Sequence, residues 1–179
     1  MTDRPNPMDA KDLAARFAAT KVLVVDDEHY MRKVVRTLLM SIGVRTVYEA
    51  ADGPAGLELI RSMAPDVVIL DWQMPGIDGA GFVRMVRSPD TFPFPDVPII
   101  MLTGHGERSR VVEAIKIGVN EFLLKPVSSK ALQDRLVAVL TNPRPFVRSG
   151  DYYGPAPRKL LPGVHSDTDR AMVNLVMVN

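Results

Sequence analysis

The sequence contains no cysteine among its 179 residues, which excludes a disulfide framework, a zinc site built on thiolates and a thiol nucleophile. It holds one tryptophan, and aromatic residues make up only 6% of the chain. Neither sign of charge is in excess, because 22 Lys and Arg residues face 21 Asp and Glu residues and the net charge is +1. This balance gives no support to a role in coating nucleic acid or in steering toward a membrane surface.

Long hydrophobic runs are also missing. No stretch approaches the roughly 18 apolar residues that a membrane-spanning helix needs. The first residues, MTDRPNPMDA, lack the basic and then apolar order of a secretory signal. We therefore expect a cytoplasmic protein with neither nucleic-acid nor membrane partners. Hydrophobic residues at 46% and charged residues at 24% are ordinary values for a globular protein, so the chain can bury a core.

Five short apolar runs alternate with helix-length segments in the middle of the chain. The runs are rich in Val, Ile and Leu without polar alternation, which is typical of parallel strands covered on both faces, and they lie at 22–25, 46–48, 67–70, 99–102 and 122–124. Amphipathic patterns predict helices at 30–41, 54–63, 79–87, 108–117 and 129–140. Because parallel neighbours need a crossover, this alternation predicts an α/β fold with a doubly wound, five-stranded parallel sheet of the flavodoxin-like class. Spacing leaves the strand order open, and 2-1-3-4-5 is the common arrangement.

Composition divides the chain into three parts. Residues 1–20 are expected to form an N-terminal extension with a short helix at about 9–19, in which Leu13 and Phe17 share one face. Residues 21–141 form the main domain, and 142–179 form a tail with proline and aromatic residues. We find no helix-turn-helix pattern in the tail, which is also short for an output domain, and a DNA-binding regulator is therefore disfavoured.

Two irregular segments carry predictions of their own. The run SPDTFPFPDVP at 88–98 is predicted to be a surface excursion on the side opposite the strand-end site described next. Residues 143–153 supply prolines and aromatic rings, so we predict that they fold back along the domain or onto a second subunit, and that 171–178 makes a further apolar contact. The alternative is a solvated linker whose aromatic residues bind a partner.

Polar side chains follow four of the five predicted strands. They are Asp26, Asp27 and Glu28 after the first strand, Asp71 after the third, Thr103 at the end of the fourth and Lys125 at the end of the fifth. Alone, each residue type is usually a turn, packing or solvated residue. Ligands in such sheets bind outside the carboxyl ends of the strands, so with the order given above these groups converge on one pocket.

Carboxylates gathered in one pocket repel one another unless a cation intervenes, and oxygen ligands favour a hard divalent ion such as Mg²⁺. The ammonium group of Lys125 suits a phosphoryl oxygen, and Thr103 can donate a hydrogen bond to the same group. Asp71 is then available as a nucleophile toward phosphorus, as aspartyl-phosphate chemistry requires.

Four motifs resemble the receiver domain of two-component response regulators, and the resemblance covers about residues 20–141. The motifs are VDDE at 25–28, DWQMPGIDG at 71–79, MLTG at 101–104 and FLLKP at 122–126. The resemblance implies a stand-alone, CheY-like bacterial signalling protein in which Asp71 accepts a phosphoryl group from the phosphohistidine of a sensor histidine kinase. It also implies that Mg²⁺ is held by Asp26, Asp27, Asp71 and the backbone carbonyl of Gln73.

The same resemblance assigns further roles. Lys125 would pair with the phosphoryl group, and the Lys125–Pro126 peptide is expected to be cis. Thr103 and Phe122 match a switch pair: phosphorylation adds about −1.5 to −2 charges, Thr103 moves toward them and Phe122 turns inward. This would alter the surface of the last two predicted helices and the strand between them, where an unknown downstream protein would bind. Gln73 and His105 match positions that set the lifetime of the phosphoryl group.

Other functions stay open. A phosphorelay intermediate or a phosphate sink would use the same site, and a homodimer could form through the switch surface or the tail. A Mg²⁺-dependent phosphohydrolase commonly needs a second carboxylate two residues after its nucleophile, where this chain has Gln73, so we expect a signalling protein rather than an enzyme. The complete acidic site disfavours an interaction module that works without phosphorylation.

Overall fold

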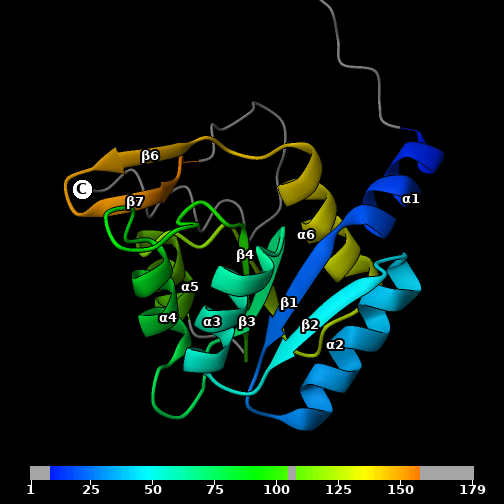
Figure 1. Cartoon of the computed structure of the whole chain (residues 1–179), viewed down its shortest axis with the longest axis horizontal. Helices are drawn as coiled ribbons and strands as arrows, with labels where there is room; N and C mark the ends of the chain where they lie inside the picture. Colours follow the sequence, from blue (N-terminus) through cyan, green and yellow to red (C-terminus); the bar gives the residue numbers. More distant parts are fainter. Residues whose placement is uncertain (1–8, 105–107, 158–179) are drawn as a thin grey trace, which may run out of the picture.

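The computed structural model describes residues 9–104 and 108–157 (Figure 1). Its central sheet has five parallel strands in the order β2-β1-β3-β4-β5. They are β1 (Lys21–Val25), β2 (Thr46–Ala50), β3 (Val67–Asp71), β4 (Ile99–Thr103) and β5 (Glu121–Leu124). The predicted doubly wound α/β fold of the flavodoxin-like class and the order 2-1-3-4-5 are therefore confirmed, with strand ends that shift by one or two residues.

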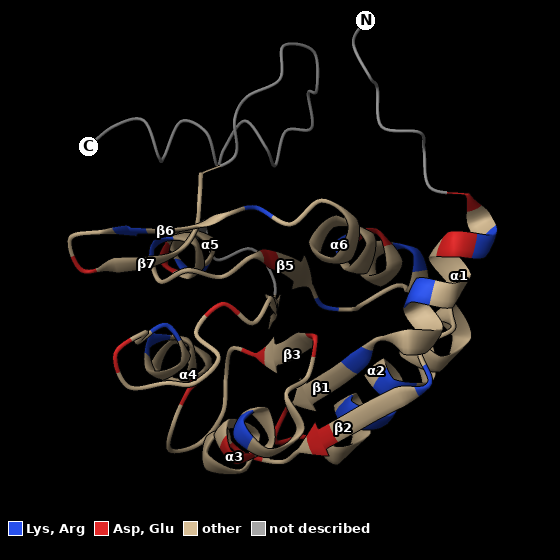
Figure 2. Cartoon of the chain, turned by 45° about the horizontal axis from the view of Figure 1, so that its top comes forward, with Lys and Arg blue, Asp and Glu red and all other residues tan. Residues whose placement is uncertain are grey.

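Helices cover both faces of this sheet. They are α1 (Ala10–Ala19), α2 (His29–Ile42), α3 (Gly53–Met63), α4 (Gly79–Val86), α5 (Arg108–Lys116) and α6 (Ser129–Thr141). Figure 2 shows α3, α4 and α5 on one side of the sheet and α1, α2 and α6 on the other. Several helices begin where the sequence supplies a capping side chain: Asp52, Asp78 and Ser128 each accept a hydrogen bond from a backbone N–H three residues later.

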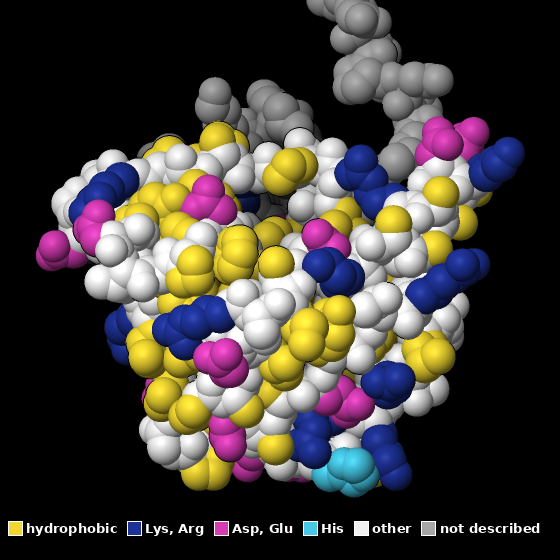
Figure 3. All heavy atoms as spheres, viewed as in Figure 1, with side chains coloured by type: hydrophobic (Ala, Val, Ile, Leu, Met, Phe, Trp, Pro, Cys, Tyr) yellow, Lys and Arg dark blue, Asp and Glu magenta, His cyan; other side chains and the backbone are white. Residues whose placement is uncertain are grey.

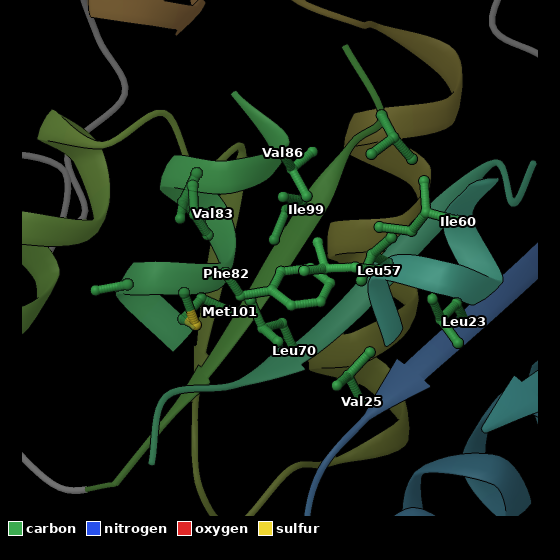
Figure 4. Close-up of a cluster of buried hydrophobic side chains, with 14 of the residues drawn as sticks. Leu23, Val25, Leu57, Ile60, Leu70, Phe82, Val83, Val86, Ile99 and Met101 are labelled. Atoms are coloured by element: carbon green, nitrogen blue, oxygen red, sulfur yellow. The ribbon is translucent and has the colours of Figure 1, made fainter. Parts of the chain in front are cut away.

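Two buried clusters hold the layers together, because neighbouring residues of a strand point to opposite faces. On one face Leu23 packs with Phe82 and with residues of α3 and α4 (Figure 4). On the other face Val22 and Val24 pack with residues of α2 and α6. Both clusters draw on every central strand, so the sheet is apolar on each side. This explains why the strand segments of the sequence show no polar alternation.

Helix α1 packs on the second of these clusters. The Asp9 side chain accepts a hydrogen bond from the backbone N–H of Asp12 (2.8 Å), which starts the helix. Phe17 is only 2% exposed and Leu13 packs beside the cluster, so the two residues do share the inward face. Arg16 also donates a hydrogen bond to the carbonyl of Leu140 at the end of α6.

A two-stranded antiparallel hairpin follows α6, formed by β6 (Phe146–Ser149) and β7 (Tyr152–Pro155). Figures 1 and 2 show it beyond the end of the sheet, close to α5. Arg148 pairs with Asp90 at 2.9 Å. The hairpin backbone comes so close to Gly118 that a Cβ there would lie 2.7 Å from a hairpin carbonyl oxygen. Residues 143–153 therefore fold back along the domain as predicted, whereas 171–178 lie outside the described residues.

The buried guanidinium of Arg87 joins the hairpin to the domain. It donates hydrogen bonds to the carbonyls of Gly118 (2.9 Å), Pro95 (2.6 Å) and Val97 (2.8 Å) and to the side-chain oxygen of Asn120 (2.9 Å). It also lies 4.9 Å from the ring centroid of Phe146. Burial lowers the pKa of Arg87 to about 9, which leaves the group charged at neutral pH. One side chain thus links α4, the 88–98 loop, the turn before β5 and the hairpin.

The 88–98 loop lies at the amino-terminal end of β4, as predicted for a surface segment opposite the strand-end site. It is more than an excursion, however, because Phe92 and Val97 are 4% and 7% exposed and belong to a core cluster. Its proline-rich sequence therefore forms a packed connection. Among the helices of the described ranges, none combines the length and the apolar character needed to cross a bilayer. On the face drawn in Figure 3, acidic, basic and hydrophobic side chains are interspersed.

Candidate functional site

Three carboxylates converge at the carboxyl ends of the central strands. Asp26 and Asp27 follow β1, and Asp71 is the last residue of the neighbouring strand β3. Each offers an oxygen atom, and the three oxygens lie within 4.8 Å of one another. Asp26 and Asp71 are buried, while Asp27 is exposed at the rim. The group does not include Glu28, whose backbone N–H instead donates a hydrogen bond to Asp26 Oδ1 at 2.8 Å.

Lys125 enters the same cluster from the end of β5. Its Nζ lies 2.8 Å from Asp71 Oδ1 and 3.8 Å from Asp26 Oδ2. The Lys125–Pro126 peptide is cis, as the family resemblance led us to expect. Since β4 lies between β3 and β5 in the sheet, the lysine reaches across the end of β4 to meet Asp71. The strand order thus places side chains that are more than 50 residues apart in one pocket.

Burial and mutual charge shift the pKa values of Asp26, Asp71 and Lys125. Burial raises the pKa of Asp26 from 3.8 to about 6, against a lowering by the Glu28 backbone hydrogen bond. Burial also raises the pKa of Asp71, although Lys125 opposes that shift. For Lys125, burial favours the neutral amine, but the hydrogen bond and charge of Asp71 outweigh it and the pKa is raised. Ionising both buried aspartates is therefore costly without further positive charge.

Two buried oxygens within the described part of the chain lack a hydrogen-bond partner: Asp26 Oδ2 and Thr103 Oγ1. Leaving such atoms unsatisfied normally costs stability, and exceptions in native structures often mark a site that takes a ligand. Asp26 Oδ2 lies 3.8 Å from Lys125 Nζ, and Asp26 is one of the three carboxylates of the cluster, where a hard cation would satisfy a free oxygen. The residues present therefore fit Mg²⁺. The Thr103 hydroxyl is free to serve a group bound at the neighbouring strand end.

Phe122 is part of the core cluster and is only 8% exposed, so its ring already occupies the inward position in this structure. It pairs in register with Met101 on β4, two residues before Thr103. The structure thus brings the two residues of the expected switch onto adjacent strands. His105 lies outside the described residues.

The side chain of Gln73 points outward beside Asp71 and meets α5. With its amide oxygen facing the Arg110 guanidinium, it accepts hydrogen bonds from both terminal nitrogens at 3.0 and 3.3 Å. The two residues, together with Trp72, Met74, Pro75 and Asp78, line an open pocket of about 400 Å³. No sequence motif marks Arg110 as a site residue. The sequence does not reveal the contact between Arg110 and Gln73, because that contact depends on how α5 packs on the sheet.

Comparisons with known proteins agree with this geometry. Residues 22–137 match the family model of the response regulator receiver domain. Chemotaxis protein CheY1 of Helicobacter pylori is 38% identical over 121 residues, which is 67% of this chain and 96% of that protein. A probable transcriptional regulator, ycf27 of Guillardia theta, is 42% identical over 120 residues, but the match spans only 45% of its length and 67% of this chain.

Solved structures give the same result. The crystal structure of a putative response regulator from Chloroflexus aurantiacus has a TM-score of 0.64 at 31% identity, with 69% of this chain and 98% of that chain covered. Chemotaxis protein CheY4 of Vibrio cholerae has a TM-score of 0.61 at 35% identity, with coverage of 68% and 98%. Sheet order, strand-end carboxylates and sequence similarity together show that this chain belongs to the response regulator receiver family and carries a CheY-like receiver domain.

Proposed function

We propose that this protein signals by accepting a phosphoryl group on Asp71 from the phosphohistidine of a sensor histidine kinase. The observation that carries the proposal is the position of Lys125 Nζ, 2.8 Å from Asp71 Oδ1, inside a cluster of three carboxylates. A buried carboxylate beside a fixed cation can present an oxygen to phosphorus while the cation faces the incoming phosphoryl oxygens. No other carboxylate of the cluster has a lysine as close.

In the proposed phosphoryl transfer, Asp71 and Lys125 have separate roles. A carboxylate oxygen of Asp71 attacks phosphorus, the phosphorus–nitrogen bond of the phosphohistidine breaks, and its electron pair stays with the imidazole. Lys125 holds the phosphoryl oxygens in place of its present contact with Asp71. Asp26, Asp27, Asp71 and the Gln73 carbonyl would hold Mg²⁺, which neutralises charge on the transferring group when bound. Thr103 then donates its unused hydroxyl to the product.

Small-molecule phosphotransfer tests the proposal. The full chain is incubated with ³²P-labelled acetyl phosphate, with Mg²⁺ in one arm and excess EDTA in the other. We expect acid-stable, base-labile label, as an acyl phosphate gives, only in the Mg²⁺ arm. Asp27→Ala keeps the nucleophile but removes one exposed ligand, so excess Mg²⁺ should partly restore labelling. Equal labelling in EDTA would contradict the metal assignment, and no label under any condition would contradict the function.

Binding of Mg²⁺ should weaken as the pH falls below about 6. Burial raises the pKa of Asp26 to about 6, so protons then compete with the cation for this ligand. The apparent affinity should fall by up to about tenfold per pH unit in that range. The folding stability of the metal-free protein should depend on pH in the opposite sense. The folded state binds the Asp26 proton more tightly than the unfolded state does, so the free energy of unfolding falls as the pH rises from 3.8 to about 6.

Fluorescence of Trp72, which is 7% exposed beside the site, provides the Mg²⁺ titration. Asp26→Asn is the control, because it removes the carboxylate that titrates. The variant should bind Mg²⁺ more weakly, and its affinity should lose most of the dependence on pH. A wild-type affinity that stays constant from about pH 7 down to about pH 5 would rule out the role given to Asp26.

Thr103 is proposed to connect phosphorylation to the surface formed by α5, β5 and α6. Thr103→Ala should still be labelled, because Asp71 and Lys125 remain, but the protein should no longer change conformation when labelled. Amide hydrogen exchange of α5 and β5, with and without acetyl phosphate, measures that change. Thr103→Ser keeps the hydroxyl and should retain most of the response. A full response in Thr103→Ala would show that the hydroxyl does not transmit the signal.

The wider assignments rest on the family. We propose a cytoplasmic regulator with an N-terminal extension at 1–20, the receiver domain at 21–141 and a tail at 142–179. Its output would be binding to a downstream protein, with no nucleic-acid or membrane contact. A phosphorelay intermediate or phosphate sink would share the chemistry and differ only in where the phosphoryl group goes next. A homodimer through the α5–β5–α6 surface or the tail would be detected as a change in mass on phosphorylation.

A further inference from the structure

We infer that Arg32 is a positioning residue for Mg²⁺ binding: its guanidinium holds the backbone carbonyl of Asp26 and thereby fixes where the Asp27 carboxylate lies in the three-carboxylate cluster. The inference rests on the proposed function, because it concerns the same metal cluster. It goes beyond that function because Arg32 is not itself a ligand of the ion and acts through one main-chain contact.

The Asp27 carboxylate is the least constrained member of the cluster. Asp26 and Asp71 are buried, and both lie beside Lys125. Asp27 is exposed, and among the residues that the structure describes none donates a hydrogen bond to its side chain. It still offers an oxygen within 4.8 Å of the oxygens of the other two carboxylates. The place of Asp27 in the cluster is therefore set mainly by its backbone.

The peptide group between Asp26 and Asp27 is held by Arg32. Nη1 of Arg32 donates a hydrogen bond to the Asp26 carbonyl at 2.8 Å. Because a peptide group is planar, fixing this oxygen also fixes the plane that contains the nitrogen and Cα of Asp27. On the other side of Asp26, its N–H donates to the Ala50 carbonyl at the end of β2 at 3.2 Å. Arg32 thus controls the direction in which the chain leaves β1 toward Asp27.

Arg32 is itself held in place. Its side chain is 14% exposed, and its Nε lies 3.7 Å from Glu49 Oε1 on β2. Its Nη2 lies 3.3 Å from Nδ1 of His29. The other oxygen of Glu49 pairs with Arg36 at 3.2 Å. A planar guanidinium can donate to a carbonyl with one nitrogen while another faces a carboxylate. The Arg32 side chain therefore connects α2 with the ends of β1 and β2.

The charge of Arg32 and its contact with Asp26 predict opposite effects on metal affinity. A positive charge near a cation site repels the ion, so loss of the charge alone should strengthen Mg²⁺ binding. Loss of the contact with the Asp26 carbonyl should weaken binding, because groups that orient the ligands of a metal typically contribute about ten- to a hundredfold to its affinity. The direction of the change therefore separates the two effects.

Mg²⁺ titrations of the full chain test the role of Arg32. Binding to wild type and Arg32→Met is followed by Trp72 fluorescence and by the thermal midpoint, which rises when the folded state binds the ion. Arg32→Met should bind Mg²⁺ about tenfold more weakly than wild type. The difference should persist in about 0.5 M KCl, because salt screens charge but does not replace a lost hydrogen bond. Midpoints in EDTA record any loss of stability separately from the affinity.

Arg36→Met is the matched control. It removes the same charge from α2 and also breaks a pair with Glu49, but the backbone carbonyl that Arg36 contacts belongs to Val47 rather than to Asp26. Its affinity for Mg²⁺ should stay within about twofold of wild type, because an exposed ion pair contributes little. Equal or tighter binding in Arg32→Met, or a weakening of the same size in Arg36→Met, would overturn the inference.

The outcomes also distinguish this inference from the function on which it rests. Wild type that binds no Mg²⁺ would overturn the metal assignment and the role of Arg32 together. Wild type that is labelled on Asp71, with an affinity for Mg²⁺ equal to that of Arg32→Met, would overturn only the role of Arg32. Weaker binding in Arg32→Met, with no label on wild type, would support that role and contradict the proposed phosphoryl transfer.

Discussion

Phosphorylation is expected to fall to background when Asp71 is replaced with Asn. The amide has nearly the shape of the carboxylate and fits the buried position at the end of β3, but it is not a nucleophile toward phosphorus. The structure should therefore survive while the chemistry is lost. The measurement is the label retained after incubation with ³²P-acetyl phosphate and Mg²⁺, read beside the thermal midpoint of each protein.

Asp134→Asn is the matched control. This substitution changes the charge by the same amount as Asp71→Asn, but on the surface of α6. The Asp134 side chain is 59% exposed there and pairs with Lys130. The variant should be labelled like wild type, because an exposed ion pair of this kind contributes little. If Asp71→Asn takes up label at the wild-type rate while remaining folded, the phosphoacceptor is a different residue.

Truncation after Asn142 is expected to lower the thermal midpoint markedly. The cut removes the β6–β7 hairpin, and with it the ring of Phe146 over Arg87 and the backbone packed against Gly118. The partial burial of the aromatic rings of the hairpin, together with the domain surface that the hairpin covers, should stabilise the folded state by about 3 kcal/mol. In a domain of this size each kcal/mol shifts the midpoint by about 2–4 °C, so a fall of about 10 °C is expected.

Truncation after Pro157 provides the control, because it keeps the hairpin and removes only residues beyond the described range. The thermal midpoint of this protein should lie close to that of the full chain and well above that of the protein truncated after Asn142. Phe146→Ala should give a part of the larger loss, since it removes contacts with both Arg87 and the Tyr153 ring at 5.7 Å. Equal midpoints for both truncations, with rapid amide exchange in 146–155, would show that the hairpin contributes nothing.

The sequence by itself determined the fold class and the polar groups at the strand ends. Unalternating apolar runs are enough to predict buried parallel strands, since a strand covered on both faces has no polar side. Local capping chemistry is also visible in sequence, as at Ser128, because the cap and the N–H it binds are three residues apart. The motif around Asp71 and the lysine at 125 then predict one pocket once the strand order is assumed.

Tertiary structure alone decided the remaining features. The tail was expected to fold back, but its hairpin pairing and its contact with Gly118 depend on a surface that exists only after α5 and β5 have packed. From the sequence Arg87 is an ordinary cation at the end of a helix. Its oxygen partners come from two segments, the 88–98 loop and the turn before β5. The contact between Arg110 and Gln73 is of the same kind. Local periodicity reports which face of an element is buried, whereas these contacts depend on the relative placement of elements, which only the packed core fixes.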